Sequence, residues 1–321
     1  MDNSELKLGK DAFVVVGPNI ESSQLIVRKS MTYWQDAWRR LRKSKASMIC
    51  LAYLVLLIIG SIVFPLVSGF GGSDIHASEV YALPGTVCTD DTYSSVGHMH
   101  WFGTDAIGRD VFTRVWLGAQ ISLFIGFMAA ITEFLIGLPY GGISGYLGGK
   151  IDMVMMRVLE IIVGIPYLII VILLLVVMEP GLWTIVLALA IVGWTGLARL
   201  VRGQIVQLKE QEFVMAAKVL GAGSSRVILN HMLPNTLGLV IVTLTMAVPG
   251  AIFSEAFLSF IGLGVQIPAS SWGMLASDGI IELRSHPYLL FIPAAFISLT
   301  MLSLNILGDK LRDVLDPRLR K

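Results

Sequence analysis

Six long stretches of this sequence are almost free of charged residues, and they leave few folds open to the chain. The stretch Ala46–Val67, for example, contains no Asp, Glu, Lys or Arg, and a helix needs about 20 apolar residues to cross a bilayer. Backbone groups inside a bilayer find partners only in helices or closed barrels, so stretches of this length predict helices. We therefore expect an all-α polytopic membrane protein with six transmembrane helices. The expected spans are Ala46–Val67, Leu117–Gly145, Met153–Met178, Gly181–Ala198, Thr236–Ile261 and Tyr288–Leu307.

The composition and the positions of the basic residues support this fold and give it an orientation. Of the 321 residues, 55% are hydrophobic, and the net charge of +1 argues against a nucleic-acid partner. With both termini in the cytoplasm, cytoplasmic segments hold 21 of the 24 Lys and Arg residues, which is the bias that membrane proteins have. The predicted parts are a cytoplasmic segment at 1–45, a transmembrane domain at 46–308 with an external loop at 71–116 and a cytoplasmic loop at 199–235, and a cytoplasmic tail at 309–321.

The segment just before the first span combines basic residues with aromatic ones. Residues 31–45 place Trp34, Trp38 and Leu41 at helical spacing beside a cluster of Arg and Lys. One interpretation is an amphipathic helix that lies on the inner leaflet of the membrane. The other is a basic cluster that only orients the first span, and the residues favour neither.

Motifs for catalysis and nucleotide binding are absent from the sequence. Neither Gly9-Lys10 nor Gly149-Lys150 completes a phosphate loop, because neither pair is followed by Ser or Thr. No G-x-S-x-G or H-E-x-x-H motif occurs either. We expect a chain that is not an enzyme, binds no cofactor and hydrolyses no ATP by itself.

Histidines and cysteines give little sign of a metal site or a disulfide. His98 and His100 lie close together in the external loop, but two histidines without a third ligand make a weak site, so no metal is expected. Cys50 begins the first span and Cys88 follows in the loop, and nothing in the sequence brings them within bonding distance. We expect both to be free thiols.

Three carboxylates fall within or at the edges of the expected spans. A charge there costs about 2.5–3.5 kcal/mol, so such residues face a bundle interior or a water-filled cavity. Glu160 follows Arg157 by three residues, which favours a local ion pair. The other two carboxylates, Glu133 and Glu255, could line a translocation pathway, relay protons, or form hydrogen bonds within the bundle. The candidate pathway residues are Glu133, Glu255, Ser254 and Ser259.

The loop between the fourth and fifth spans is rich in small residues. We expect a helix over Gln204–Leu220, a left-handed cap at Gly221 or Gly223, and a short helix over Arg226–His231 that Ser224 or Ser225 caps. Pro234 would then mark the start of the fifth span. Small side chains allow close approach to another surface, so this hairpin is either a docking element or a loop packed on its own spans.

At this loop the sequence resembles the permease subunits of bacterial ABC importers. Their signature is Glu-Ala-Ala, three residues, Gly, nine residues, Ile, one residue, Leu-Pro. Here Ala216-Ala217, Gly221 and Leu233-Pro234 match, whereas Met215 replaces the glutamate and His231 the isoleucine. Other segments resemble the C-type subunit of the oligopeptide, dipeptide and nickel permeases. These are HWFGTDAIGRDVFTRVWLGAQISL at 100–123, GISGYLGGKIDMVMMRVLEIIVGIP at 142–166, EAFLSFIGLGVQIPASSWG at 255–273 and NILGDKLRDVLDPRLR at 305–320.

The resemblance implies a type I importer permease in a bacterial cell membrane that carries peptides. Its expected partners are a second permease, two cytoplasmic ATPases that bind ATP and Mg, an extracytoplasmic binding protein and the lipid bilayer. Residues implied in coupling to the ATPase are Glu212, Met215, Ala216, Ala217, Lys218, Gly221, Ala222, Gly223, Arg226, Leu233 and Pro234. Candidates for contact with the binding protein are Gly103, Thr104, Asp105, Arg109, Asp110 and Trp272. Two alternatives stay open: a nickel or metallophore importer of the same superfamily, and a proton-coupled secondary carrier.

Overall fold

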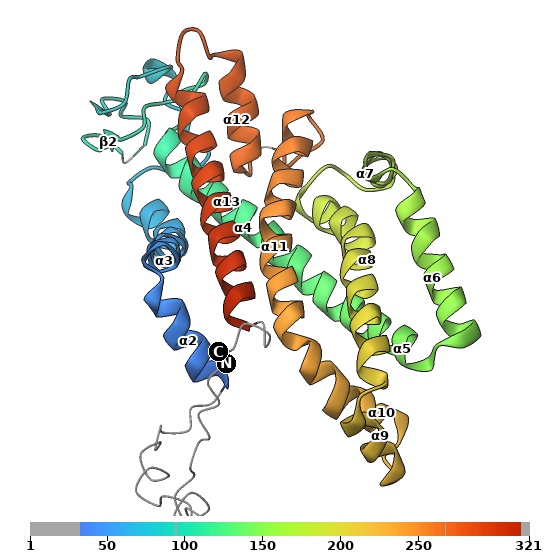
Figure 1. Ribbon diagram of the computed structural model, residues 1–321. Helices are drawn as coiled ribbons and strands as arrows, with labels where there is room; N and C mark the ends of the chain where they lie inside the picture. The colour runs from blue at the N-terminus through green and yellow to red at the C-terminus, as the bar shows by residue number, and fades with distance from the viewer. Residues whose placement is uncertain (1–32, 94, 267, 316–321) are drawn as a thin grey trace, which may run out of the picture.

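The chain folds into a bundle of long helices with a small two-stranded sheet at one end (Figure 1). The structure is a computed structural model that describes residues 33–93, 95–266 and 268–315, so residues 1–32 of the predicted cytoplasmic segment and 316–321 of the predicted tail lie outside the described residues. The elements are α2 (Tyr33–Lys43), α3 (Lys45–Val67), η1 (Ala77–Glu79), β1 (Thr86–Val87), β2 (Met99–His100), α4 (Val111–Thr132), η2 (Glu133–Gly137), α5 (Leu138–Leu147), α6 (Gly149–Gly164), α7 (Tyr167–Val177), α8 (Leu182–Lys209), α9 (Glu212–Val219), α10 (Ser224–Arg226), η3 (Val227–Met232), α11 (Leu233–Phe260), α12 (Trp272–Ile281) and α13 (Tyr288–Leu315).

The described residues contain five helical stretches long and apolar enough to cross a membrane, or six if one bent pair counts as a span. The five are α3, Val111–Leu147, α8, Ser224–Phe260 and α13. In the bent pair, α6 and α7 meet at 79° beside Pro166, whose ring and missing N–H disfavour a continuous helix. The expected third span is therefore broken. The second span begins earlier than expected because Asp110 caps α4, accepting the Thr113 N–H at 2.7 Å.

Glycines allow α5 and the turn before it to lie directly on α8. Gly137, Gly141 and Gly145 recur every fourth residue and so share one helix face. A Cβ added at Gly141 would lie only 2.3 Å from the carbonyl oxygen of Ala198, and Cβ atoms at the other two would lie 2.8 Å from backbone oxygens of α8. The two backbones are in contact, as small residues permit between membrane helices.

Two wide helical turns, η2 and η3, each end two residues before a proline, Pro139 and Pro234. A proline offers no N–H to the carbonyl four residues earlier and crowds it, and a π-helical turn accommodates this without ending the helix. Both turns border one apolar cluster that includes the fully buried Met232. The predicted separate helix Arg226–His231 is thus wrong, because the helix that starts at Ser224 continues past Pro234 to Phe260.

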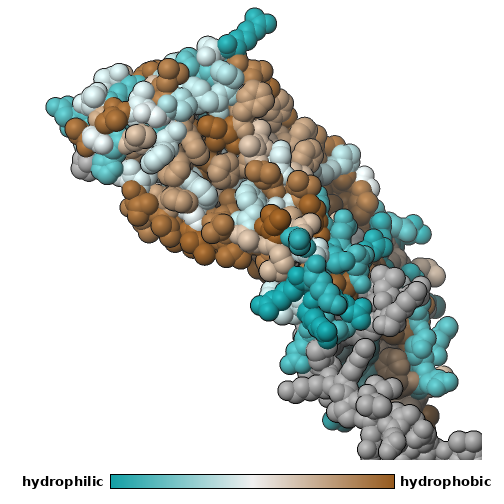
Figure 2. All heavy atoms as spheres, turned by 60° about the vertical axis from the view of Figure 1, so that its left-hand side comes forward, coloured by the Kyte–Doolittle hydropathy of each residue, from teal (hydrophilic) through white to brown (hydrophobic). Residues whose placement is uncertain are grey.

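The predicted amphipathic helix before the first span is α2. Its Leu41 packs against Cys50 and Leu307, and Ala37 packs against residues of α11 and α13, while Trp38 stays 44% exposed. The side chain of Trp34 lies outside what the structure describes. Figure 2 shows broad apolar surface over the bundle and hydrophilic side chains gathered towards its lower end. Part of the apolar face of α2 is therefore covered by the bundle itself.

Candidate functional site

A helical hairpin formed by α9 and α10 stands at the lower end of the bundle in Figure 1. The predicted single helix over Gln204–Leu220 is wrong, since α8 stops at Lys209 and Gln211 adopts an extended backbone before α9. This change of direction points Val214 into the hairpin, where it is fully buried beside Val227. No Gly or Pro marks the break, so its cause is the burial of Val214 and not a local breaker.

The turn of the hairpin is a Schellman cap centred on Gly221. The Gly221 N–H donates to the Lys218 carbonyl and the Ala222 N–H to the Ala217 carbonyl, both at 3.0 Å. Gly221 has φ +84°, which glycine adopts without strain, whereas Gly223 has an ordinary φ of −65°. The predicted left-handed cap is therefore at Gly221. The expected serine cap is absent, because Gly223 precedes the helix and makes no side-chain cap.

The predicted coupling residues divide between the outside and the inside of the hairpin. Ala217 and Ala222 are half-buried against its core, and Leu233 is buried. The exposed members are Glu212, Met215, Ala216, Lys218, Gly221, Gly223, Arg226 and Pro234. Two residues that the sequence did not single out, Val219 and Leu220, are 87% and 86% exposed at the turn. The hairpin thus presents an apolar tip on a packed base.

Charged side chains tie the base of the hairpin to α5 and α6. Lys209 Nζ donates to the Tyr146 carbonyl at 2.7 Å, and Lys218 Nζ lies 5.2 Å from the centre of the Tyr146 ring. Two turns earlier in α8, Arg202 donates twice to the Asp152 carboxylate, at 2.5 Å each. These contacts connect the base of the hairpin to α5 and α6. No sequence motif predicts this link, because Asp152 and Arg202 are 50 residues apart.

The predicted pathway residue Glu255 is enclosed where three helices meet. Its carboxylate accepts hydrogen bonds from Ser259 Oγ at 2.7 Å and from Ser122 Oγ of α4 at 3.3 Å. Ser122 Oγ in turn accepts the N–H of Trp272, the first residue of α12, at 3.3 Å. Glu255 is fully buried in this conformation and joins α4, α11 and α12. Its role in a pathway, like that of the neighbouring Ser254, stays a prediction.

The other two membrane carboxylates differ in their surroundings. Glu160 pairs with Arg157 at 2.6 Å, as expected from their spacing, and both side chains are exposed. Glu133 opens the π-helical turn η2 and approaches Gly193 of α8. Among the described residues it has no hydrogen-bond or ion-pair partner, and it is half-buried. Glu133 is therefore the membrane carboxylate with free bonding capacity, and its part in transport stays a prediction.

The residues predicted to meet a binding protein are buried within the loop before α4 and at the start of α12. Asp105 accepts hydrogen bonds from Arg109 Nε at 2.8 Å and from Arg114 Nη1 at 2.5 Å, and Thr104 Oγ1 donates to the Glu79 carbonyl. The full set with low exposure is Gly103, Thr104, Asp105, Arg109, Asp110 and Trp272. In this structure these residues are buried and hold the loop together, and their contact with a binding protein stays a prediction. Exposed residues in the same segment include Trp101 and Ile107.

The same loop contains the small sheet, in which Thr86 pairs with His100 in antiparallel register. His100 is fully buried and donates to Asp110 at 2.8 Å and to Glu79 at 3.0 Å. Burial lowers the pKa of His100, but these two carboxylates outweigh it and raise the pKa. Burial raises the pKa of Glu79, but hydrogen bonds from Thr89 and His100 outweigh burial and lower this pKa to about 2. His98 is exposed, so the two histidines that the sequence paired do not form a joint site.

Comparison with known families decides what kind of protein has this arrangement. Residues 137–321, more than half of the chain, match the family described as "Binding-protein-dependent transport system inner membrane component". Residues 32–84 match the "N-terminal TM domain of oligopeptide transport permease C". This chain is a binding-protein-dependent transport permease. The family that the signature motifs indicated is thereby confirmed.

Relatives of this permease extend over almost its whole length. It is 49% identical over 310 residues to the dipeptide transport system permease protein DppC of Bacillus subtilis, covering 96% of this chain and 93% of the relative. It is 46% identical over 312 residues to the oligopeptide transport system permease protein OppC of the same organism, covering 97% and 98%. The OppC protein of Escherichia coli K12 is 42% identical over 296 residues, covering 92% and 95%.

Solved structures resemble the permease in fold alone. An inward-facing crystal form of the MetNI methionine ABC transporter has a TM-score of 0.53 and 16% sequence identity, covering 63% of this chain and 96% of that chain. A second crystal form of the same transporter has a TM-score of 0.51 and 17% identity. The bundle therefore has the type I importer permease fold.

Proposed function

We propose that this permease is the C-type membrane subunit of an ABC importer for oligopeptides or dipeptides. The cargo is inferred from relatives named as dipeptide and oligopeptide permeases, at 49% and 46% identity. The observation that carries the coupling role is the hairpin, in which Val219 and Leu220 stand exposed on a turn fixed by two backbone hydrogen bonds. Apolar side chains of this size in water, held by a packed base, suit docking to a partner protein.

The partner at this hairpin is proposed to be a cytoplasmic ATPase subunit. The chain has no phosphate loop, so the energy of ATP has to enter through another protein. The Lys and Arg bias places the hairpin on the cytoplasmic side of a bacterial cell membrane and the loop with β1 and β2 outside, towards a binding protein. A second permease would complete the translocation pathway. The exposed apolar side chains of α3, such as Leu56 and Leu66, leave surface for lipid or that second permease.

Two connections could carry motion from the hairpin into the membrane. The first is the unbroken helix from Ser224 to Phe260, 37 residues long, whose far end holds Glu255 against α4 and α12. At about 1.5 Å per residue this rod spans roughly 55 Å. The second is the contact of Lys209 and Arg202 with α5 and α6. ATPase closure would tilt both helices together, and a two-state bundle would convert that tilt into opening and closing of the pathway.

The docking proposal is tested by removing the apolar tip without touching the hairpin core. Leu220→Ser changes a side chain that is 86% exposed, so the permease should fold and reach the membrane normally. Co-purification of the ATPase subunits and ATP-driven peptide uptake should both fall at least tenfold. The matched control is Ile281→Ser in α12, which is 79% exposed at the opposite end of the bundle and should keep its ATPases. Undiminished ATPase binding and uptake in Leu220→Ser would refute the docking role.

The alternatives are separated by the energy source and by the cargo. Uptake that persists when the partner ATPases carry inactive nucleotide sites would favour a proton-coupled carrier over an ABC importer. In that case Glu133→Gln, which removes the unpartnered membrane carboxylate, should abolish uptake, whereas an ATP-driven importer does not need it as a proton relay. The ligand that co-purifies with the partner binding protein decides between peptide and metal cargo.

A further inference from the structure

The segment between α3 and α4 forms a small lobe whose interior is polar and aromatic. His76, Cys88, Ser95 and His100 are at most 1% exposed, and Phe70, 4% exposed, stacks on His100 with ring centres 4.3 Å apart. Lobes this small bury too little apolar surface to be stable alone and are commonly held by disulfides or metal ions. A disulfide within the lobe is ruled out, because Cys88 is its only cysteine and is a free thiol.

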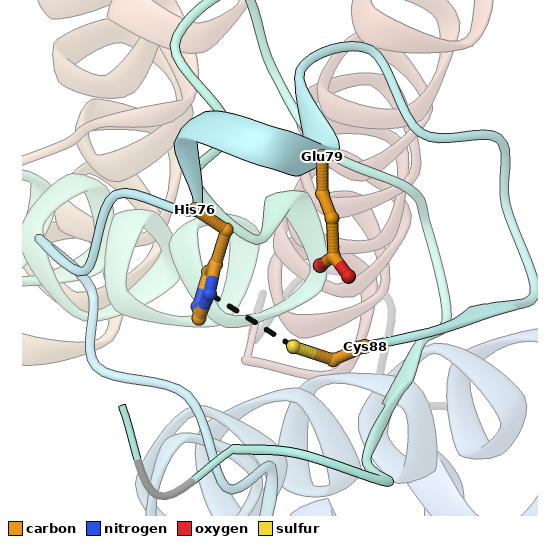
Figure 3. Close-up of side chains that lie close together, drawn as sticks. All are labelled: His76, Glu79 and Cys88. Carbon is orange, nitrogen blue, oxygen red and sulfur yellow. Dashed lines mark hydrogen bonds between the residues drawn. The ribbon is translucent and has the colours of Figure 1, made fainter. Parts of the chain in front are cut away.

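Three side chains converge inside this lobe from two separate elements. His76 precedes η1, Glu79 ends it, and Cys88 directly follows β1 (Figure 3). One ligand atom from each, an imidazole nitrogen, a carboxylate oxygen and a sulfur, all lie within 4.8 Å of one another. Cys88 Sγ is 3.9 Å from His76 Nδ1, and Asp90 Oδ2 is also 3.9 Å from that nitrogen. The cluster therefore gathers electron-pair donors of three chemical kinds around one point.

Hydrogen bonds among these groups account poorly for their convergence. The contacts of Cys88 Sγ with His76, Ser95 and the Asp90 carbonyl are all 3.8–3.9 Å long, and a thiol has one weakly donated proton for all of them. Zn–S and Zn–N bonds of about 2.3 and 2.0–2.1 Å place the two ligand atoms roughly 3.5 Å apart in a tetrahedral site. The observed 3.9 Å is close to that separation. A shift of a few tenths of an ångström would bring this pair of atoms to that separation, and all three ligand atoms lie within 4.8 Å of one another.

We propose that His76, Glu79 and Cys88 bind a divalent cation of the zinc class, with Asp90 able to supply a fourth ligand. Thiolate, imidazole and carboxylate together suit zinc better than magnesium or calcium, which prefer oxygen ligands.

The surroundings of the cluster resemble the outer sphere of a metal site. Ser95 Oγ lies 3.4 Å from His76 Nε2, so it can fix the tautomer that leaves Nδ1 free to bind a cation. The Glu79 carboxylate is held by the Thr89 N–H at 2.5 Å and by His100 Nε2 at 3.0 Å. Supporting partners of this kind orient metal ligands, and removing one typically weakens metal binding 10–100-fold.

The cation would fix the lobe against the start of α4. It would pin η1 to the residue after β1, and His100, which holds Glu79, also bonds to Asp110, the cap of α4. The carbonyl of His76 is packed so closely on Gly108 that a Cβ there would lie 2.1 Å away. The expected consequence is a metal-dependent stability of the lobe, outside the membrane spans.

Cobalt and zinc binding to the purified, tag-free transporter complex tests the proposal. After treatment with a chelator, Co²⁺ added to the wild-type complex should give a thiolate-to-cobalt charge-transfer band that Zn²⁺ then removes, with one ion per permease. Zn²⁺ should also raise the unfolding temperature. Absence of the cobalt band in the wild-type complex would overturn the proposal without recourse to any variant.

Matched substitutions assign the ion to this cluster. Cys88→Ser and His76→Gln should each remove the cobalt band and weaken zinc binding at least 100-fold, more than the loss of a supporting partner. Cys50→Ser is the control thiol, buried in α3 away from the lobe, and His98→Gln is the control imidazole; both should bind as the wild type does. Equal zinc binding by Cys88→Ser and Cys50→Ser would place the ion elsewhere and overturn the proposal.

Discussion

The contact between α5 and α8 makes Gly141→Ala a severe change for the addition of one methyl group. The new Cβ would lie 2.3 Å from the Ala198 carbonyl oxygen, although such atoms do not approach closer than 3.0 Å. The α8 backbone must therefore retreat by about 0.7 Å, and overpacking of this kind typically costs about 1–3 kcal/mol. The higher helix propensity of alanine returns roughly 1 kcal/mol. We expect a net loss of about 0–2 kcal/mol in unfolding free energy.

Gly196→Ala on the facing helix is the matched control, because a Cβ at Gly196 meets no atom within 4 Å. Gly196→Ala has the same gain in helix propensity without the collision, so the two variants should differ by the overpacking cost, about 1–3 kcal/mol. Thermal unfolding of the purified permease, followed by the reaction of its two buried thiols with a fluorogenic reagent, measures the difference. The midpoints should be roughly 2–5 °C apart. A Gly141→Ala protein that unfolds at or above the temperature of Gly196→Ala would refute direct backbone contact between these helices.

The remaining predictions concern the hairpin and its base. Gly221→Leu should lower stability by about 1–2 kcal/mol because of the positive φ at this position, and it should uncouple ATP hydrolysis from uptake. Gly221→Asn should retain uptake, because asparagine tolerates that conformation. Equal activity of the two variants in a reconstituted uptake assay would contradict the cap. Asp152→Asn weakens the two hydrogen bonds that the carboxylate accepts from the partly exposed Arg202, so it should lower stability by about 1 kcal/mol and slow uptake. Glu160→Gln, in an exposed ion pair, should change the unfolding midpoint little. Identical unfolding midpoints of the two variants would show that the Asp152 pair does not hold the hairpin base.

The spans were predictable because a lipid environment requires long stretches without charged residues, and such stretches are recognised in a sequence without knowing how the helices pack. The expected third span is bent at Pro166, where the cause is local, since a proline disfavours a continuous helix through its own ring. Pro139 and Pro234 are prolines like Pro166, but their helices continue past them, because the π-helical turns just before them accommodate the missing hydrogen bond. Whether a proline ends a helix therefore depended on packing around the turn.

The sites were less predictable than the spans. Gly221 could be placed at the cap because a left-handed turn needs glycine. The break at Gln211 could not be placed, since it accompanies burial of Val214 in a cluster drawn from earlier and later parts of the chain. The motif residues of the external loop were recognisable as a pattern, and the pattern did not reveal that Asp105 is enclosed by two arginines. A signature identifies residues that matter without saying which way they face.

The position of Glu79 and Cys88 illustrates the same limit for a metal cluster. Sequence proximity suggested His98 with His100, whereas the fold turns His98 outward and brings His76 towards a cysteine twelve residues away. Only the pairing of β1 with β2 and the tight approach at Gly108 create that neighbourhood. Neither feature has a strong local signal in so short a sheet.

The exposed tip of the hairpin also bears on how the complex is made in a cell. Val219 and Leu220 are 87% and 86% exposed at the turn of the hairpin, which stands at the lower end of the bundle (Figure 1). A newly inserted subunit without the proposed ATPase partner therefore exposes these apolar side chains to water. Such a surface invites self-association and recognition by proteases. With the proposed docking, subunits left over from uneven synthesis would then be short-lived, because only assembly with the ATPase would cover the hairpin tip.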